Sequence, residues 1–231
     1  MKNVVETLFL VSLLLLLSCS KDETKNSLGG DTDIALTKVD SVSDLYITID
    51  NDARVYADMK VLSNKNGDVT YGITVDLKTL TPDVVNILLN NFSSIKDKIE
   101  NRGKINISND MILDAEFTIK ITSEGYLDYF VDGKPWIVAK YSDGVGTKYT
   151  VVSNSGETLT RTVTEKTGEN DWPLGFFDIK TSLIEQEVPA GDPLFKKISY
   201  RVNHKFGLVY LEVVLQDGHE IKTDIIPWFL L

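Results

Sequence analysis

The chain is poor in the residues that carry most enzyme and metal chemistry. It has one cysteine and two histidines in 231 residues. A single cysteine excludes an intrachain disulfide and a cysteine zinc site, so stability must come from burial and backbone pairing. His204 and His219 flank a predicted strand of about eight residues, roughly 25 Å long, too far apart to share a metal or a proton relay. We therefore predict no metal site and no cofactor.

Catalytic motifs are absent as well. The sequence has no Gly-x-Ser-x-Gly elbow and no phosphate loop, and Asp143–Lys148 (DGVGTK) lacks the spacing of one. With 34 acidic residues, a pair of carboxylates suited to glycoside hydrolysis can arise anywhere, and nothing in the sequence selects one. The expectation is a non-enzymatic protein, with a carboxylate-based hydrolase as an alternative.

Positive charge is in deficit. Lysine and arginine number 24 against 34 aspartates and glutamates, which gives a net charge of −10. An acidic surface repels phosphate backbones, so no nucleic acid is expected among the partners. Hydrophobic residues at 42% and charged residues at 25% are typical of a globular protein.

The first eighteen residues have the pattern of a secretory signal. Leu8–Leu17 is an apolar run of about ten residues, too short to span a bilayer. It ends in Leu16-Leu17-Ser18-Cys19, which resembles the lipobox of bacterial lipoproteins. The resemblance implies that residues 1–18 are removed and that Cys19 becomes a lipidated N-terminus that anchors the protein in a membrane.

The residues after the cysteine carry a second resemblance. Ser20, Lys21, Asp22 and Glu23 are similar to the export signal of surface lipoproteins of the Bacteroidota. This implies an outer-membrane protein displayed at the cell surface, with a periplasm-facing protein as the alternative. Residues 19–40 are polar and include Gly29-Gly30, a composition that predicts a flexible tether.

Alternating patterns begin after residue 40. Arg54–Leu62 and Val69–Leu77 alternate between apolar and polar residues, and Asn66-Gly67 between them is suited to a tight turn, so the region predicts a β-hairpin. One amphipathic helix is expected at about 82–101, because Thr81 can cap it and Pro82 fits its first position. Its apolar residues fall on one face: Val84, Leu88, Phe92, Ile95 and Ile99.

Short predicted strands fill the rest of the chain. A hairpin turning at Asp132-Gly133 is followed by strands at about 148–153, 158–165, 176–184, 196–203, 208–216 and 220–226. The fold class is mainly β (α+β), with antiparallel sheets or a β-sandwich and one helix. We expect an α+β domain over 41–135 and an antiparallel sandwich-like domain over 136–231, with one continuous domain as the alternative.

One polar loop carries aromatic residues. Thr167–Asp178 (TGENDWPLGFFD) contains Trp172, Phe176 and Phe177, which are candidate ligand-binding residues because flat rings stack well on sugar faces or apolar side chains. Trp172 folding back onto the sheet is the competing interpretation. The hypothesis is a lipid-anchored envelope protein that acts as a binding module for a glycan or protein ligand. The alternative is a structural or assembly subunit of an envelope complex.

Overall fold

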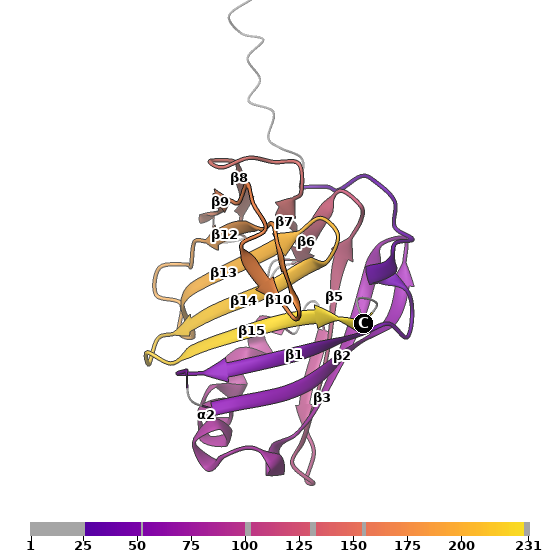
Figure 1. Cartoon of the computed structure of the whole chain (residues 1–231). Helices are drawn as coiled ribbons and strands as arrows, with labels where there is room; N and C mark the ends of the chain where they lie inside the picture. Colours follow the sequence, from indigo (N-terminus) through magenta and orange to yellow (C-terminus); the bar gives the residue numbers. More distant parts are fainter. Residues whose placement is uncertain (1–25, 52, 100–102, 130–132, 154–155, 229–231) are drawn as a thin grey trace, which may run out of the picture.

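The computed structural model describes residues 26–51, 53–99, 103–129, 133–153 and 156–228 (Figure 1). Within these ranges the chain is mainly β, its strands pair antiparallel, and it has a single α-helix, as the alternation of the sequence predicts. The residues that resemble the lipobox and the export signal, 16–23, lie outside the described ranges. No helix among the described residues has the length and apolar character needed to cross a membrane.

The elements follow one another in a strand-rich order. The strands are β1 (Val42–Ile49), β2 (Ala53–Lys65), β3 (Asp68–Asp76), β4 (Gly103–Ile107), β5 (Ile112–Ile121), β6 (Gly125–Tyr129), β7 (Pro135–Lys140), β8 (Lys148–Val152), β9 (Thr158–Lys166), β10 (Trp172–Leu174), β11 (Phe177–Ile179), β12 (Ser182–Gln186), β13 (Phe195–Asn203), β14 (Gly207–Leu215) and β15 (Glu220–Pro227). The helical elements are the 3-10 turns η1 (Ala35–Thr37) and η2 (Leu77–Thr79) and the helix α2 (Pro82–Ile99).

Among the described residues, thirteen strands form one antiparallel sheet. Its order is β7-β6-β5-β3-β2-β1-β15-β14-β13-β12-β9-β8, and β4 pairs with β5 beside this path. The two regions predicted as separate domains meet where β1 pairs with β15, with Tyr46 opposite Asp224. Strands from both regions therefore contribute to one continuous, strongly curved sheet (Figure 1).

The curved sheet is nearly closed, because its two outermost strands approach each other. The indole Nε1 of Trp136 on β7 donates to the carbonyl oxygen of Tyr149 on β8 at 3.0 Å. The Lys140 amide donates to the hydroxyl of Tyr149 at 3.0 Å. The result is a barrel-like sheet with an inner face and an outer face. Alternation alone fits a sandwich equally well, since both architectures bury one face of each strand.

The tight turns follow the predicted chemistry where they can be described. Asn66 and Gly67 both have positive φ, 56° and 88°, as a two-residue hairpin turn requires. Asp50 and Asn51 form a similar pair between β1 and β2, with φ of 53° and 64°. The predicted turn at Asp132 lies outside the described residues.

Helix α2 confirms the predicted amphipathic helix and crosses one end of the sheet. Pro82 is its first residue, and Ile99 is its last described one. Near its start, Val84 packs with Ile49 and Val55, which flank the β1–β2 turn. Near its end, Lys98 forms an ion pair with Asp192 in the loop between β12 and β13. Val84 is the buried residue of α2, so most of the apolar face stays partly accessible.

Residues 26–40, expected to belong to the flexible tether, make specific contacts with the sheet. The Asn26 side chain donates to the carbonyl oxygen of Thr150 on β8 at 2.7 Å. Leu36 and Thr37 in η1 are buried, with 8% and 0% of their surface exposed. The polar composition of the segment does not reveal these contacts, because backbone and amide groups make most of them.

The predicted strand at 176–184 is divided in the structure. β11 ends at Ile179 and pairs with β10 in a separate two-stranded hairpin, whereas β12 begins at Ser182 and joins the main sheet. Hydrogen bonds from two side chains stabilise the segment between β11 and β12. Asn203 donates to the carbonyl oxygen of Lys180 at 2.7 Å, and the hydroxyl of Thr167 accepts from the Thr181 amide at 2.8 Å.

Candidate functional site

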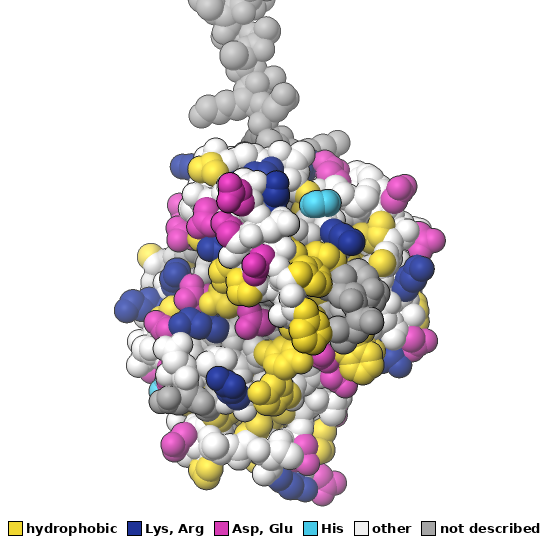
Figure 2. Space-filling model, in the orientation of Figure 1, with side chains coloured by type: hydrophobic (Ala, Val, Ile, Leu, Met, Phe, Trp, Pro, Cys, Tyr) yellow, Lys and Arg dark blue, Asp and Glu magenta, His cyan; other side chains and the backbone are white. Residues whose placement is uncertain are grey.

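The β10–β11 hairpin carries the aromatic residues that the sequence nominates for ligand binding. It lies on the outer face of the sheet and covers β13–β15 through a small apolar cluster: Leu174, Ile179, Phe206 and Val209, with Trp172 and Ile226 at its border. Figure 2 shows apolar side chains gathered on this face of the molecule. The hairpin is therefore a packed element and not a free loop.

Trp172 uses its ring within the fold. Its indole lies edge-on to Tyr210, with the ring centroids 5.1 Å apart, and the Arg201 guanidinium stands 4.2 Å from its centroid. Phe176, in contrast, exposes 92% of its surface at the hairpin tip, and Phe177 exposes 41%. Of the three nominated side chains, the two phenylalanines face solvent.

The two histidines stay apart in the structure. His204 lies in the exposed turn between β13 and β14. His219 lies 2.7 Å from Asp50, between its Nδ1 and a carboxylate oxygen, and this hydrogen bond raises the pKa of the imidazole. Within the described ranges, no three His, Cys, Asp or Glu side chains come together as metal ligands do.

The most apolar hollow is a cavity of about 420 Å³ on the inner face of the sheet. Its volume falls within the roughly 300–1,000 Å³ that small-molecule sites usually have. The wall is formed by the inner face of strands from opposite parts of the curved sheet, by α2 and by the β12–β13 loop. Its apolar part includes Leu45, Ile47, Met59, Ile73, Phe117, Ile119, Val138, Ile198, Leu208, Leu211, Val213 and Ile225.

The cavity follows from the width of the sheet. Barrels of about eight strands are just filled by their own side chains, and wider ones enclose a space. Here twelve strands surround the interior of the described structure. Phe117 and Ile119 on β5 and Leu211 and Val213 on β14 line that interior, yet each remains only partly buried. They face a space that side chains from the opposite wall do not fill.

One polar cluster lies in the wall. Arg161 on β9 is 2% exposed. Its Nε donates to Oε1 of Gln186 at 2.8 Å, and its Nη1 donates to the carbonyl oxygen of Trp136 at 2.9 Å. Its Nη2 lies 3.4 Å from both a carboxylate oxygen of Asp128 and the hydroxyl of Tyr200. The guanidinium also stacks on the Trp136 ring at 3.9 Å. The cluster thus joins β6, β7, β9, β12 and β13.

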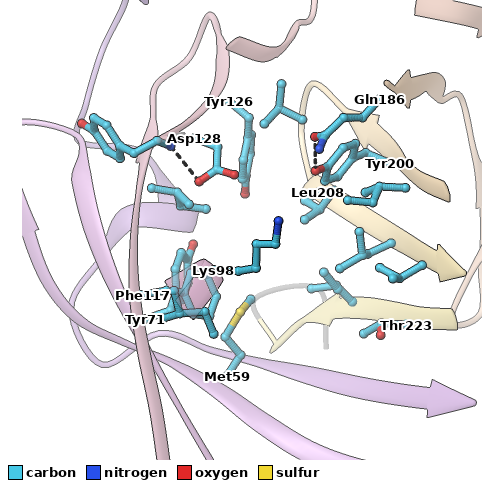
Figure 3. Close-up of a pocket in the computed structure, with 18 of the residues that line it drawn as sticks. Met59, Tyr71, Lys98, Phe117, Tyr126, Asp128, Gln186, Tyr200, Leu208 and Thr223 are labelled. Atoms are coloured by element: carbon cyan, nitrogen blue, oxygen red, sulfur yellow. Dashed lines mark hydrogen bonds between the residues drawn. The ribbon is translucent and has the colours of Figure 1, made fainter. Parts of the chain in front are cut away.

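A second charged pair lies where α2 meets the β12–β13 loop. Figure 3 shows the Lys98 amine directed into the space between Tyr71 and Phe117 on one side and Leu208 and Thr223 on the other. Its ion-pair partner, the Asp192 carboxylate, is 2% exposed. Burial raises the pKa of Asp192, but the Lys98 hydrogen bond and the backbone amides of Phe195 and Leu194 outweigh it and lower that pKa.

Two tyrosines on the cavity wall are kept neutral. Burial raises the pKa of Tyr126 to about 12 and raises the pKa of Tyr71 well above its ordinary value. A tyrosine is uncharged at physiological pH in any case, and these shifts extend the neutral state of both hydroxyls to more alkaline pH. Among the described residues that line the cavity, the charged side chains are those of Lys98, Asp128, Arg161 and Asp192.

Comparison with protein-family models, with curated proteins and with solved structures finds no significant match. The geometry of this chain alone therefore carries the functional argument.

The sequence of β9 contains one signal for the cavity wall. Leu159, Arg161 and Val163 occupy alternate positions of β9, so an arginine stands at an inward position between two buried apolar residues. A charged residue there must find buried partners. The cavity itself leaves no local signal, because it depends on how many strands surround it.

We predict that Arg161→Met destabilises the fold strongly. The change leaves the Asp128 carboxylate, 13% exposed, and the Trp136 carbonyl without their buried donor. Removing one partner of a buried ion pair typically costs about 3–5 kcal/mol in the free energy of unfolding. Urea denaturation of the full chain measures it. Lys104→Met is the matched control, because its Glu116 pair is exposed and contributes about 0–1 kcal/mol. Equal effects of the two substitutions would refute a structural role for the Arg161 cluster.

Proposed function

We propose that the protein is a binding protein that holds an apolar or amphiphilic small molecule inside its sheet. The cavity of about 420 Å³ is the observation that carries this proposal. It is mostly apolar, it contains a few polar groups, and it is built from rigid strands, which are the usual features of a small-molecule site. Apolar side chains that face it gain burial when an apolar occupant displaces water.

The carboxylates of the cavity favour binding over acid–base chemistry. Asp128 accepts hydrogen bonds from Arg161 and from the Tyr129 amide at 2.8 Å. Asp192 accepts from Lys98 and, through its other oxygen, from the Leu194 and Phe195 amides at 2.9 Å. A general acid needs a raised pKa, and the pKa of Asp192 is lowered. A carboxylate-based hydrolase therefore finds no support in this cavity.

Membrane anchoring is the second part of the proposal, and its support is the resemblance of residues 16–23 to lipoprotein signals. Asn26 is fixed on β7 and β8 through Thr150 and the Ile137 amide. It lies seven positions after Cys19, a span of at most about 25 Å for an extended chain. A lipid at Cys19 would therefore hold the sheet close to the bilayer.

Filling the cavity is expected to abolish binding. Val213→Phe places a ring in the cavity from β14, and Val214→Phe places the same ring on the outer face of the same strand. The full chain, purified from membranes into phosphatidylcholine nanodiscs, is irradiated with a photoactivatable hexadecanol, and the crosslinked peptides are mapped by mass spectrometry. Crosslinks to Phe117–Ile119 should fall about tenfold in Val213→Phe and persist in Val214→Phe. Equal crosslinking of both variants would refute the cavity as the site.

The anchor is tested in cells of a bacterium that makes this class of lipoprotein. Wild type should incorporate an alkyne-tagged palmitate and Cys19→Ser should not. Protease treatment of intact cells should remove a C-terminal tag from the wild type and spare a variant without Lys21, Asp22 and Glu23. Protection of both would place the protein inside the envelope, and labelling of Cys19→Ser would contradict lipidation at that residue.

The exposed hairpin tip favours a second binding proposal, for a glycan or an envelope protein. Phe176 is the most exposed large apolar residue among those described, at 92%, and Gly175 beside it has a φ of 63°. If this exposed ring contacts a ligand, Phe176→Ser should lower binding to glycan arrays or recovery of envelope partners by pull-down. The ring contributes little to packing within the fold. The unfolding midpoint should stay within experimental error. Unchanged binding on both assays would remove this surface from consideration.

A further inference from the structure

The charged groups of the cavity indicate which kind of molecule it accepts. We infer that the occupant is an amphiphile with an anionic head group and an apolar tail, and that Lys98 binds the head. This inference rests on the proposed function and deepens it. Two of the described residues in the wall, Arg161 and Lys98, are cations, and they differ in how far their existing contacts leave them able to bind a ligand.

Arg161 is already committed to the fold. Its guanidinium donates to Gln186 and Trp136, contacts Asp128 and Tyr200, and is stacked on an indole ring. A ligand that drew it away would remove a buried donor from the Asp128 carboxylate and from the Trp136 carbonyl, which is costly. Arg161 therefore acts as a structural cation.

Lys98 is differently placed. Its side chain is 24% exposed, and its amine points into the cavity (Figure 3). An ammonium has three donors, and Asp192 takes one of them through Oδ2. A lysine stem is flexible, so the amine can bind a second anion at small cost. Its position at the last turn of α2 lets it reach the cavity from the end of the sheet.

The partner of Lys98 has hydrogen bonds of its own to the backbone. Asp192 is held by the backbone amides of Leu194 and Phe195, both at 2.9 Å from Oδ1. Those two hydrogen bonds help to lower its pKa, so the carboxylate stays stabilised when Lys98 shares its donors. Lys98 can therefore bind a carboxylate or phosphate head without leaving Asp192 unsatisfied.

The remaining wall suits the tail of such a molecule. Met59, Phe117 and Leu211 are among the apolar residues around the space that Lys98 enters, and Tyr71 and Tyr126 are neutral. An anionic head at Lys98 would place its tail among these side chains. A cationic head would meet Lys98 itself, and a neutral head would gain no ion pair.

The test compares three ligands of equal tail length on the full chain in phosphatidylcholine nanodiscs. Crosslinking of photoactivatable palmitate to Phe117–Ile119 is measured with unmodified palmitate, hexadecanol or hexadecylamine as competitor. In wild type, palmitate should compete at least about tenfold better than either, as expected for one charge-assisted hydrogen bond. Lys98→Met should remove this preference, so that palmitate competes no better than hexadecanol. Lys96→Met, exposed on the same helix, should behave as wild type.

A second variant distinguishes two roles of Lys98: binding the head group of the ligand, and only holding α2 in place. Asp192→Asn keeps the oxygen that accepts from Leu194 and Phe195 but removes the competing charge, so palmitate binding should be kept or increased. If Lys98 only fastens the helix, Lys98→Met and Asp192→Asn will weaken palmitate and hexadecanol alike, and the inference fails. Equal affinities of all three ligands in wild type also overturn it while sparing the cavity as a binding site. Absence of any cavity crosslink refutes the proposed function instead.

The same nanodisc experiment distinguishes two sources of the anionic head group, a membrane phospholipid and a free fatty acid. Phosphatidylglycerol nanodiscs present an anionic head on a two-chain membrane lipid. If they suppress palmitate crosslinking in wild type and not in Lys98→Met, the anionic-head inference is supported and the source is the membrane. If palmitate binds equally in both nanodiscs and still requires Lys98, the inference is supported for a free acid.

Discussion

The buried Arg161 guanidinium is the constraint on which the shape of the sheet depends. It stacks on Trp136, bonds to Gln186 and contacts Asp128 and Tyr200, so one side chain ties together strands from both ends of the sheet order. A buried cation persists only where its partners are all in place. The same indole donates across the β7–β8 approach. The approach of β7 to β8 and the contacts of the Arg161 charge therefore depend on the same side chain, Trp136.

Closure of so wide a sheet produces the cavity. Each inward side chain reaches only part of the way across, and the two walls, one formed around β1–β5 and the other around β12–β15, do not meet in the middle. Helix α2 covers one end. It is fixed by Val84 near its first turn and by Lys98 at its last, with a half-accessible apolar face between them. The site is thus defined by a scaffold of hydrogen-bonded strands and by one helix packed less completely.

Local pattern predicted the parts of this fold and not their closure. Alternation identified the strands, Asn66-Gly67 the turn, and Pro82 the start of the helix, because each depends on a few neighbouring residues. The break between β11 and β12 escaped prediction, since Asn203 holds it from a distant strand. The cavity could not be predicted from the sequence for a more general reason. Periodicity says which face of a strand is apolar, but the number of strands around the interior is set by pairings such as β1 with β15.

The unfilled interior links binding to stability. Phe117, Ile119, Leu211 and Val213 face the cavity without full burial, so part of their apolar surface is not used to stabilise the fold. An occupant that binds only the folded state supplies that burial, and at a hundred times its dissociation constant it stabilises the fold by about 2.7 kcal/mol. That amount is a sizeable share of the roughly 5–15 kcal/mol that holds a typical domain together. If the proposed binding function holds, occupancy of the cavity would therefore add to the stability that the Arg161 cluster already gives the sheet.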